Sequence, residues 1–314
     1  MNGIELSRAF YREYGEPMLK EKFGGITNEI AVGVCGSGSD SFGFDDEISR
    51  DHDFEAGFIV FLPGEDVVSR RDEFLLERAY NALPSEFNGV KRANISPVGG
   101  NRRGVMRYAD FFESKTGFPD GNLSIEAWLR IPENYLFEAV CGEIFFDGSG
   151  EVTAIREKLR RMPEDAVLKR LAGNFLVMNQ SGQYNYARCV RRGESGAAQL
   201  ALYEFVKAAI NCAFLLENEY CPYYKWAFRA LKNLPLGKSV ADTLETLISA
   251  DNSPENFALK QAGIERVCGV LAEAATERKN LSPVKTNDTE RLAYAINDRI
   301  SSANVRNLDV FYCV

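Results

Sequence analysis

The sequence predicts an α+β fold in which strands and helices alternate in the first half and helices fill the second. Segments with the pattern of strands are mixed with helical ones only before about residue 150. From residue 151 onward, apolar residues recur at helical spacing almost to the end. We therefore expect two domains, one of residues 1–150 with a small mixed sheet and flanking helices, and an all-α domain of residues 151–314.

The first half begins with an amphipathic pattern over residues 5–24, which predicts a helix that ends at Gly24-Gly25. Residues 29–34 have the composition of a strand. The apolar run 54–62 is stopped by Pro63-Gly64 and predicts a buried central strand. The other elements expected in this half are a helix at 69–83 and strands at 122–131 and 143–146.

The second half shows helical periodicity in several successive segments. Ile155, Leu159 and Met162 fall on one face of a helix that Pro163 ends. A longer apolar pattern runs over residues 197–219. Further helices are expected at 222–234, 238–250, 253–278 and 287–302.

Composition excludes several classes of function. The chain of 314 residues has a formal net charge of -8, a pI near 5.1 and a single histidine. One histidine excludes a multi-histidine zinc or iron site, and an acidic chain lacks the footprint of a nucleic-acid or anionic-membrane binder. The seven cysteines are scattered and never spaced as C-x-x-C, which is typical of reduced thiols. With no leader pattern and no expected membrane span, these features indicate a cytoplasmic protein.

The most informative stretch connects the first two predicted strands and is rich in Gly, Ser and Asp. Asp51 and Asp53 are two residues apart, so on extended backbone both carboxylates point to one face, while His52 points to the other and is expected to be packed. Two hard oxygen ligands on one face suit Mg²⁺, whose shell substrate phosphates and water would complete.

Upstream, Gly36 and Ser37 form a turn after the first strand. Their backbone N–H groups and the hydroxyl suit phosphate oxygens, and Gly38 and Gly43 permit close approach of a ligand. The stretch is not a Walker A loop, since no Gly-Lys-Ser/Thr follows, and its glycine spacing is not that of a dinucleotide fingerprint.

Together, Gly36-Ser37 and Asp51-His52-Asp53 resemble the signature of the polymerase-β-type nucleotidyltransferase superfamily, which includes antibiotic adenylyltransferases. A longer motif runs from Gly36-Ser37 through Ser39 to Asp53. Together with segments 182–186 and 223–226, it resembles a narrower bacterial group, a domain family of unknown function. The resemblance implies an N-terminal catalytic domain and a C-terminal helical domain that closes the cleft and selects the acceptor. The resemblance to the narrower group implies a fold but no established substrate.

The resemblance also implies further site residues. A third carboxylate is expected on a later strand, and Glu126 is the best match, as general base, metal ligand or both, although the family usually has Asp there. Lys225 is the candidate cation of the helical domain for the triphosphate, and Arg50 is a second candidate. Tyr184, Asn185 and Arg188 lie on a predicted helix, where a structural role is expected over a functional one.

The implied reaction is Mg²⁺-dependent transfer of AMP from ATP, or of the equivalent group from another nucleoside triphosphate, to the hydroxyl of a small molecule, with release of pyrophosphate. Two alternatives remain open. One is a catalytically silent nucleotide-binding or interaction protein, including an antitoxin-like role, and the other is a protein adenylyltransferase. A nucleic-acid acceptor is not expected, because nothing resembles a basic track.

Overall fold

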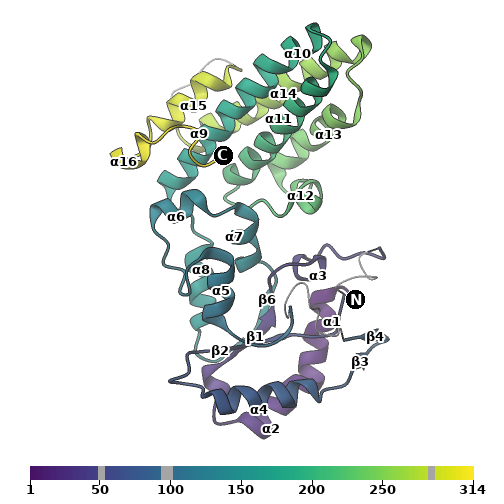
Figure 1. Ribbon diagram of the computed structural model, residues 1–314, viewed down its shortest axis with the longest axis vertical. Coiled ribbons are helices and arrows are strands. Elements are labelled where there is room, and N and C mark those ends of the chain that lie inside the picture. Colours follow the sequence, from purple (N-terminus) through teal and green to yellow (C-terminus); the bar gives the residue numbers. More distant parts are fainter. Residues whose placement is uncertain (49–53, 93–101, 282–286) are drawn as a thin grey trace. The chain divides into compact units, whose positions relative to one another are not determined.

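The structure, a computed structural model, describes residues 1–48, 54–92, 102–281 and 287–314 (Figure 1). It forms two compact units. Unit 1 comprises Met1–Leu123 and Tyr135–Arg161, and unit 2 comprises Ser124–Asn134 and Met162–Val314. The described strands all belong to unit 1, whereas unit 2 is helical throughout its described elements. The α+β class with a helical C-terminal part is thus confirmed.

The sheet of unit 1 has four strands in the order β5-β2-β1-β6 and is mixed. The strand β1 pairs antiparallel with both β2 and β6, and β5 pairs parallel with β2. A separate hairpin joins two short strands. The bounds are β1 (Ala31–Val34), β2 (Ile59–Leu62), β3 (Glu86–Phe87), β4 (Val90–Lys91), β5 (Gly104–Arg107) and β6 (Glu143–Asp147). The strands expected at 29–34 and 143–146 are confirmed, and of the run 54–62 only the last four residues are strand.

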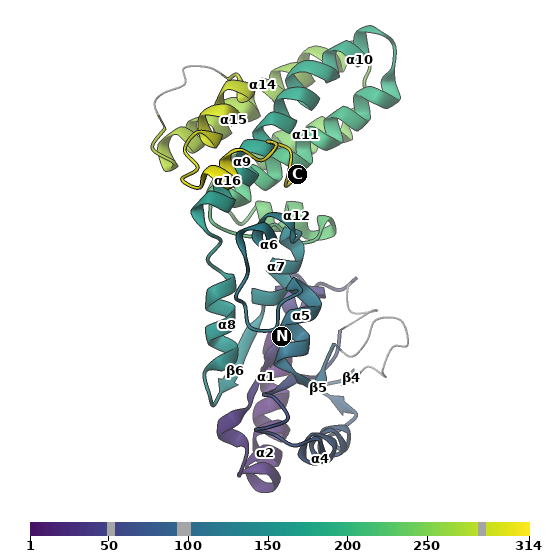
Figure 2. The same ribbon diagram turned by 60° about the vertical axis from the view of Figure 1, so that its left-hand side comes forward.

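Helices cover both faces of this sheet (Figure 2). The first helix runs without a break through α1 (Gly3–Phe10), the π-helical segment η1 (Tyr11–Gly15) and α2 (Glu16–Phe23), as the pattern over 5–24 predicts. With α4 (Arg70–Asn81) it packs on the face that carries Val32 and Val60, where Phe10, Leu19 and Leu76 are buried. On the opposite face, the ring of Phe111 in α5 (Tyr108–Thr116) lies 5.3 Å from that of Phe61.

The strand expected at 122–131 is wrong, because these residues form the helix α6 (Ile125–Arg130). Ser124 caps it, since its Oγ accepts a hydrogen bond of 3.2 Å from the backbone N–H of Ala127. Over so few residues, apolar spacing does not separate a strand from a helix. Three consecutive residues are buried, Ala127, Trp128 and Leu129, which a strand with alternating faces would not produce.

A buried arginine attaches α6 to the helices of unit 2. The guanidinium of Arg170 donates to the carbonyl oxygens of Trp128 (2.9 Å) and Ile131 (2.6 Å). Unit 2 therefore includes 124–134, whereas α8 (Glu151–Leu159) belongs to unit 1. The division thus differs in these two segments from a single boundary at residue 150.

Unit 2 is built around the apolar helix α11 (Ser195–Leu216), which packs against α9, α13 and α14. Contrary to the sequence expectation, α11 is long and apolar enough to cross a membrane by length and composition. However, 61% of its most apolar window is buried by the protein, as in the core helix of a globular domain. The other elements of unit 2 are α9 (Glu164–Met178), the π-helical η4 (Asn179–Tyr186), α10 (Ala187–Arg191), α12 (Tyr224–Leu231), α13 (Pro235–Ser249), α14 (Pro254–Arg278), α15 (Thr289–Asn297) and α16 (Ala303–Arg306).

Candidate functional site

Four segments meet at one edge of the sheet. The strand β1 leaves the sheet there after Val34, and β6 starts opposite it at Glu143. In register with Gly33, β2 starts at Ile59, and β5 starts beside it at Gly104. The loop after β1 therefore lies next to the residues that precede β2 and β5, although they are distant in sequence. This edge is where Gly36, Ser37 and Ser39 are brought together.

Glycines shape the loop after β1. Gly36 and Gly38 have φ angles of 88° and 115°, and Gly43 ends the short helix α3 (Ser39–Phe42) with a φ of 68°. Side chains other than glycine rarely adopt such angles. At Gly38 a side chain would also collide with the guanidinium of Arg102. At Gly38 the group that approaches the backbone closely is thus a side chain of the protein, and close approach of a ligand at Gly38 and Gly43 remains a prediction.

Hydrogen bonds to the carbonyl oxygens hold the peptide groups of the loop after β1. The oxygen of Gly36 accepts a hydrogen bond of 3.3 Å from Cys141 Sγ, and the oxygen of Ser37 accepts one of 3.0 Å from Arg102 Nε. Gly36 N–H donates to the carbonyl oxygen of Glu138 in α7 (Glu133–Val140) at 3.1 Å. The loop thus has three consecutive N–H groups, those of Ser37, Gly38 and Ser39, without an acceptor among the described residues.

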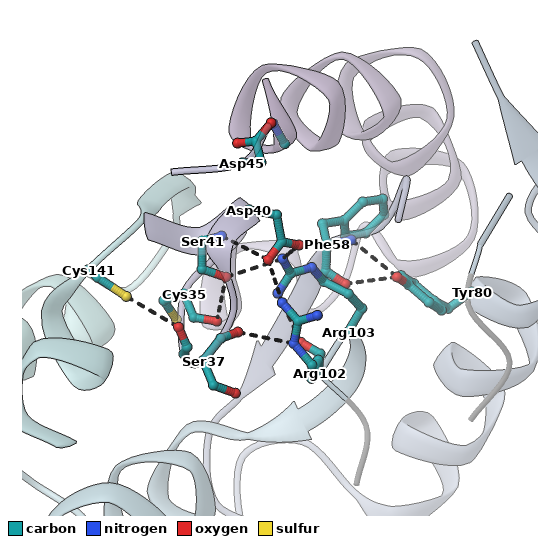
Figure 3. Close-up of polar contacts among 12 residues, drawn as sticks. Cys35, Ser37, Asp40, Ser41, Asp45, Phe58, Tyr80, Arg102, Arg103 and Cys141 are labelled. Carbon is teal, nitrogen blue, oxygen red and sulfur yellow. Dashed lines mark hydrogen bonds and ion pairs between the residues drawn. The ribbon is translucent and has the colours of Figure 1, made fainter. Parts of the chain in front are cut away.

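A buried ion cluster lies beneath this loop (Figure 3). Asp40, with a side chain 1% exposed, pairs with Arg102 through one oxygen and with Arg103 Nη2 at 2.5 Å through the other. Arg103 is 3% exposed and also donates to Ser41 Oγ at 3.2 Å. Two guanidinium groups therefore bond one carboxylate directly beside the loop. Consecutive backbone N–H groups near arginine side chains form an arrangement that attracts anions.

Sequence reasoning missed Arg102 and Arg103. The sequence contained a signal for their burial, because two adjacent arginines directly precede the strand β5. Residues next to a strand of the sheet are carried with it toward the protein interior. A buried arginine needs a carboxylate or several carbonyl oxygens as partners. In the sequence, no local pattern separates Asp40 from the other acids of this stretch.

Among the other predicted site residues, Arg50, Asp51, His52 and Asp53 lie outside the described residues. They belong to the segment that leads into Phe54 and β2, and their proposed roles remain predictions.

Glu126 does not occupy a strand. It lies in the first turn of α6 and is exposed, so the expectation that placed it on a strand is wrong, whereas its place beside Asp51 and Asp53 remains a prediction. Hydrogen bonds from its own backbone N–H and from the Ser124 hydroxyl hold the pKa of its carboxyl below the usual value. A lowered pKa makes a carboxylate a weaker general base.

Lys225 lies on α12 in unit 2 and is exposed, with its Nζ 5.2 Å from the centre of the Trp226 ring. Similarly, Tyr184 is exposed on η4, where the guanidinium of Arg188 lies over its ring at 4.5 Å. Asn185 is exposed beside it. Contacts of this kind are common on protein surfaces.

Within the part of the chain that the structure describes, no group of three His, Cys, Asp or Glu side chains is placed to hold a metal ion. Both oxygens of Asp40 are occupied by arginines. Asp45 differs, since its Oδ2 accepts a hydrogen bond of 3.2 Å from Gly3 N–H, whereas its buried Oδ1 has no partner among the described residues. An unsatisfied carboxylate oxygen thus lies in the stretch between Gly43 and Asp51.

The thiols next to the loop give a testable prediction. Burial raises the pKa of Cys35 to about 11 and raises that of Cys141 as well, which keeps Cys141 protonated as the donor to Gly36. At pH 8 the thiolate is then a small fraction of either group, and the thiolate is the form that reacts. We expect iodoacetamide to label partly exposed Cys189 in the folded protein well before these two. Peptide mass spectrometry would contradict this if Cys141 reacted as fast as Cys189.

Comparison with protein families gives a partial match. A family described as a domain of unknown function (DUF4037) matches residues 128–227, about a third of the chain. The matched range contains segments 182–186 and 223–226, which the sequence linked to a family of this kind, but not the loop after β1. None of the curated proteins matches this chain.

Among solved structures, the chain resembles a nucleotidyltransferase-like protein from Exiguobacterium sibiricum. The two are 12% identical, and the alignment covers 87% of this chain and 78% of that chain, with a TM-score of 0.37.

Proposed function

We propose that the chain is a nucleotidyltransferase that transfers AMP from ATP, with Mg²⁺, to the hydroxyl of a small molecule and releases pyrophosphate. One observation carries the proposal. The N–H groups of Ser37, Gly38 and Ser39 have no acceptor among the described residues, and they belong to a loop that lies at the sheet edge where β2 begins and that Arg102 bonds through the oxygen of Ser37. In the sequence, Asp51 and Asp53 come shortly before that strand.

These groups suit a polyphosphate. Backbone N–H groups in a glycine-rich turn bind phosphate oxygens, and the exposed hydroxyl of Ser37 adds a donor. Charge-assisted hydrogen bonds are roughly twice as strong as neutral ones, so consecutive N–H donors favour a charged phosphate over a neutral ligand. The leaving pyrophosphate is the most highly charged product of the reaction, and the loop would stabilise it.

The donors in this region fit Mg²⁺. Asp51 and Asp53 would hold the ion as hard oxygen ligands, and Asp45 Oδ1 is a further carboxylate oxygen with no described partner. When bound, Mg²⁺ supplies charge neutralisation and alignment of the phosphates. Asp40 is not a ligand in this proposal, because both of its oxygens are held by arginines.

In the transfer, the acceptor hydroxyl oxygen forms a bond to the α-phosphorus, and the bond from that phosphorus to the bridging oxygen of pyrophosphate breaks. The hydroxyl proton passes to a base or to water. The loop would hold the leaving phosphates in line with the attacking oxygen, which lowers the barrier by orientation and by electrostatic stabilisation. The proposal assigns no base, because the side chain of Glu126 is exposed on α6 and the pKa of its carboxyl is lowered.

The test uses the full chain with Mg²⁺, each α-labelled nucleoside triphosphate and a panel of hydroxylated small molecules. We expect pyrophosphate release and a labelled small product from the wild type. The Asp51→Asn/Asp53→Asn variant is expected to lose at least about 100-fold in rate, since metal polarisation supplies several kcal/mol. The Asp242→Asn/Asp298→Asn variant removes two exposed acids from unit 2 and should retain the wild-type rate.

Equal pyrophosphate release by the wild type and the Asp51→Asn/Asp53→Asn variant would contradict the proposal. Label on protein rather than on a small molecule would instead favour a protein adenylyltransferase. Metal-dependent binding of ATP without transfer to any acceptor would favour the catalytically silent alternative, including an antitoxin-like role.

A further inference from the structure

Arg102 joins the loop to the buried ion cluster. Its Nε donates to the carbonyl oxygen of Ser37 at 3.0 Å, and its Nη2 pairs with Asp40. Its side chain is 17% exposed, and the guanidinium lies where a side chain at Gly38 would be (Figure 3). One planar group therefore bridges a loop carbonyl and a carboxylate.

This contact orients the peptide between Ser37 and Gly38. In a trans peptide the C=O and the N–H point in opposite directions. Because the oxygen of Ser37 points to Arg102, the N–H of Gly38 points away from it. In the same way, the bond from Cys141 to the oxygen of Gly36 directs the N–H of Ser37 away from Cys141.

The guanidinium is itself fixed by its partner. Asp40 is 1% exposed, and Arg103 holds its second oxygen at 2.5 Å, so the carboxylate has little freedom to turn. Two bonds from one planar group, Nη2 to Asp40 and Nε to the oxygen of Ser37, define both the position and the plane of the guanidinium. The order of contacts is Arg103 to Asp40, Asp40 to Arg102, and Arg102 to Ser37.

We propose that Arg102 is a positioning residue that keeps the Gly38 N–H oriented as a donor for the polyphosphate of the ligand. The proposal rests on the proposed function for the identity of the ligand. A lysine would keep the charge, but it lacks the planar fork that bonds Ser37 and Asp40 in one geometry. Positioning and simple attraction of charge therefore predict different results for Arg102→Lys.

The test measures binding of ATP and of inorganic tripolyphosphate, each with Mg²⁺, by calorimetry. We expect Arg102→Lys and Arg102→Ala to weaken binding of both ligands by about 10- to 100-fold, the range that corresponds to loss of a charge-assisted hydrogen bond. Arg107→Lys is the matched control. Arg107 lies on the same strand β5, donates to the carbonyl oxygens of Pro63 and Val68, and pairs with Glu73 at 2.6 Å. The Arg107→Lys variant should lose a similar amount of folding stability and bind both ligands with wild-type affinity.

A second measurement separates positioning from folding. In ¹⁵N-labelled protein, tripolyphosphate should shift the amide resonances of Ser37 and Gly38 in the wild type and in Arg107→Lys, but not in Arg102→Lys. Wild-type affinity in Arg102→Lys would overturn the positioning role, whether or not Arg102→Ala also binds with wild-type affinity.

The outcomes keep this inference distinct from the proposed function. Binding of tripolyphosphate that depends on Arg102, without nucleotidyl transfer, would leave the positioning role and contradict the enzyme. If the wild type bound neither tripolyphosphate nor ATP, both proposals would fail.

Discussion

Replacing Asp40 with alanine is expected to destabilise unit 1 by about 3–5 kcal/mol, the usual cost of removing one partner from a buried ion pair. The carboxylate is 1% exposed and bonds two guanidinium groups, of which Arg103 is 3% exposed. Without it, Arg103 would be a buried charge with no carboxylate, in a position that water does not reach. The loop after β1 would lose its attachment at the same time.

The two tryptophans make the measurement specific. Trp128 and Trp226 both belong to unit 2, so their fluorescence follows that unit, whereas hydrogen exchange of peptides from β1 and β2 follows unit 1. In a urea series, Asp40→Ala should lower the transition of unit 1 and leave the tryptophan transition nearly unchanged. Glu65→Ala breaks an exposed ion pair with Arg70 in unit 1 and should change neither by much. Equal shifts in the Asp40 and Glu65 variants would contradict the importance of the cluster.

Gly142→Ala should be nearly as damaging, at about 2–5 kcal/mol, because two costs combine. Gly142 connects α7 to β6 with a φ of 70°, which an alanine adopts only with strain. An added Cβ would also collide with the carbonyl oxygen of Val34, and backbone of a central strand has little room to move. Because Cys141 is the adjacent residue, we also expect weaker binding of ATP.

Gly150→Ala is the matched control for this variant. Gly150 has a φ of 78°, close to that of Gly142, but an added Cβ meets no atom within 4 Å. The Gly150→Ala variant should therefore lose only the free energy of unfolding that corresponds to the backbone strain, about 1 kcal/mol. The difference between the two variants in the urea transition of unit 1 measures the crowding against Val34. Equal losses would show that crowding contributes nothing.

Local sequence patterns predicted most of the fold. Each correctly predicted element has a hydrophobic period or a stop signal within a few residues, and these elements are β1, β6, the helix over 3–23 and the helices of unit 2. The short helix α6 was missed because six residues carry too little periodicity. The apolar character of α11 was underestimated, although its burial explains it.

The candidate site was only partly predictable. Gly36 and Ser37 have a local signature, and they lie on the loop that the structure brings to the sheet edge. The partners of Asp40 are 62 and 63 residues further along the chain, and only the parallel pairing of β5 with β2 brings them close. No local pattern encodes a contact at that separation. The secondary structure around Glu126 was predicted wrongly, because its residues form the helix α6 and not a strand.

The path of the chain has a practical consequence for dissecting this protein. It passes from one unit to the other at 123/124, at 134/135 and again at 161/162. A fragment that ends at Arg161 would retain α6 but lack Arg170 and the rest of its packing partners, so Trp128 and Leu129 would become exposed apolar surface. Such a fragment should aggregate rather than report on the loop after β1. Separating the units requires replacing residues 124–134 by a short polar linker, which would leave unit 1 intact with the candidate site on it.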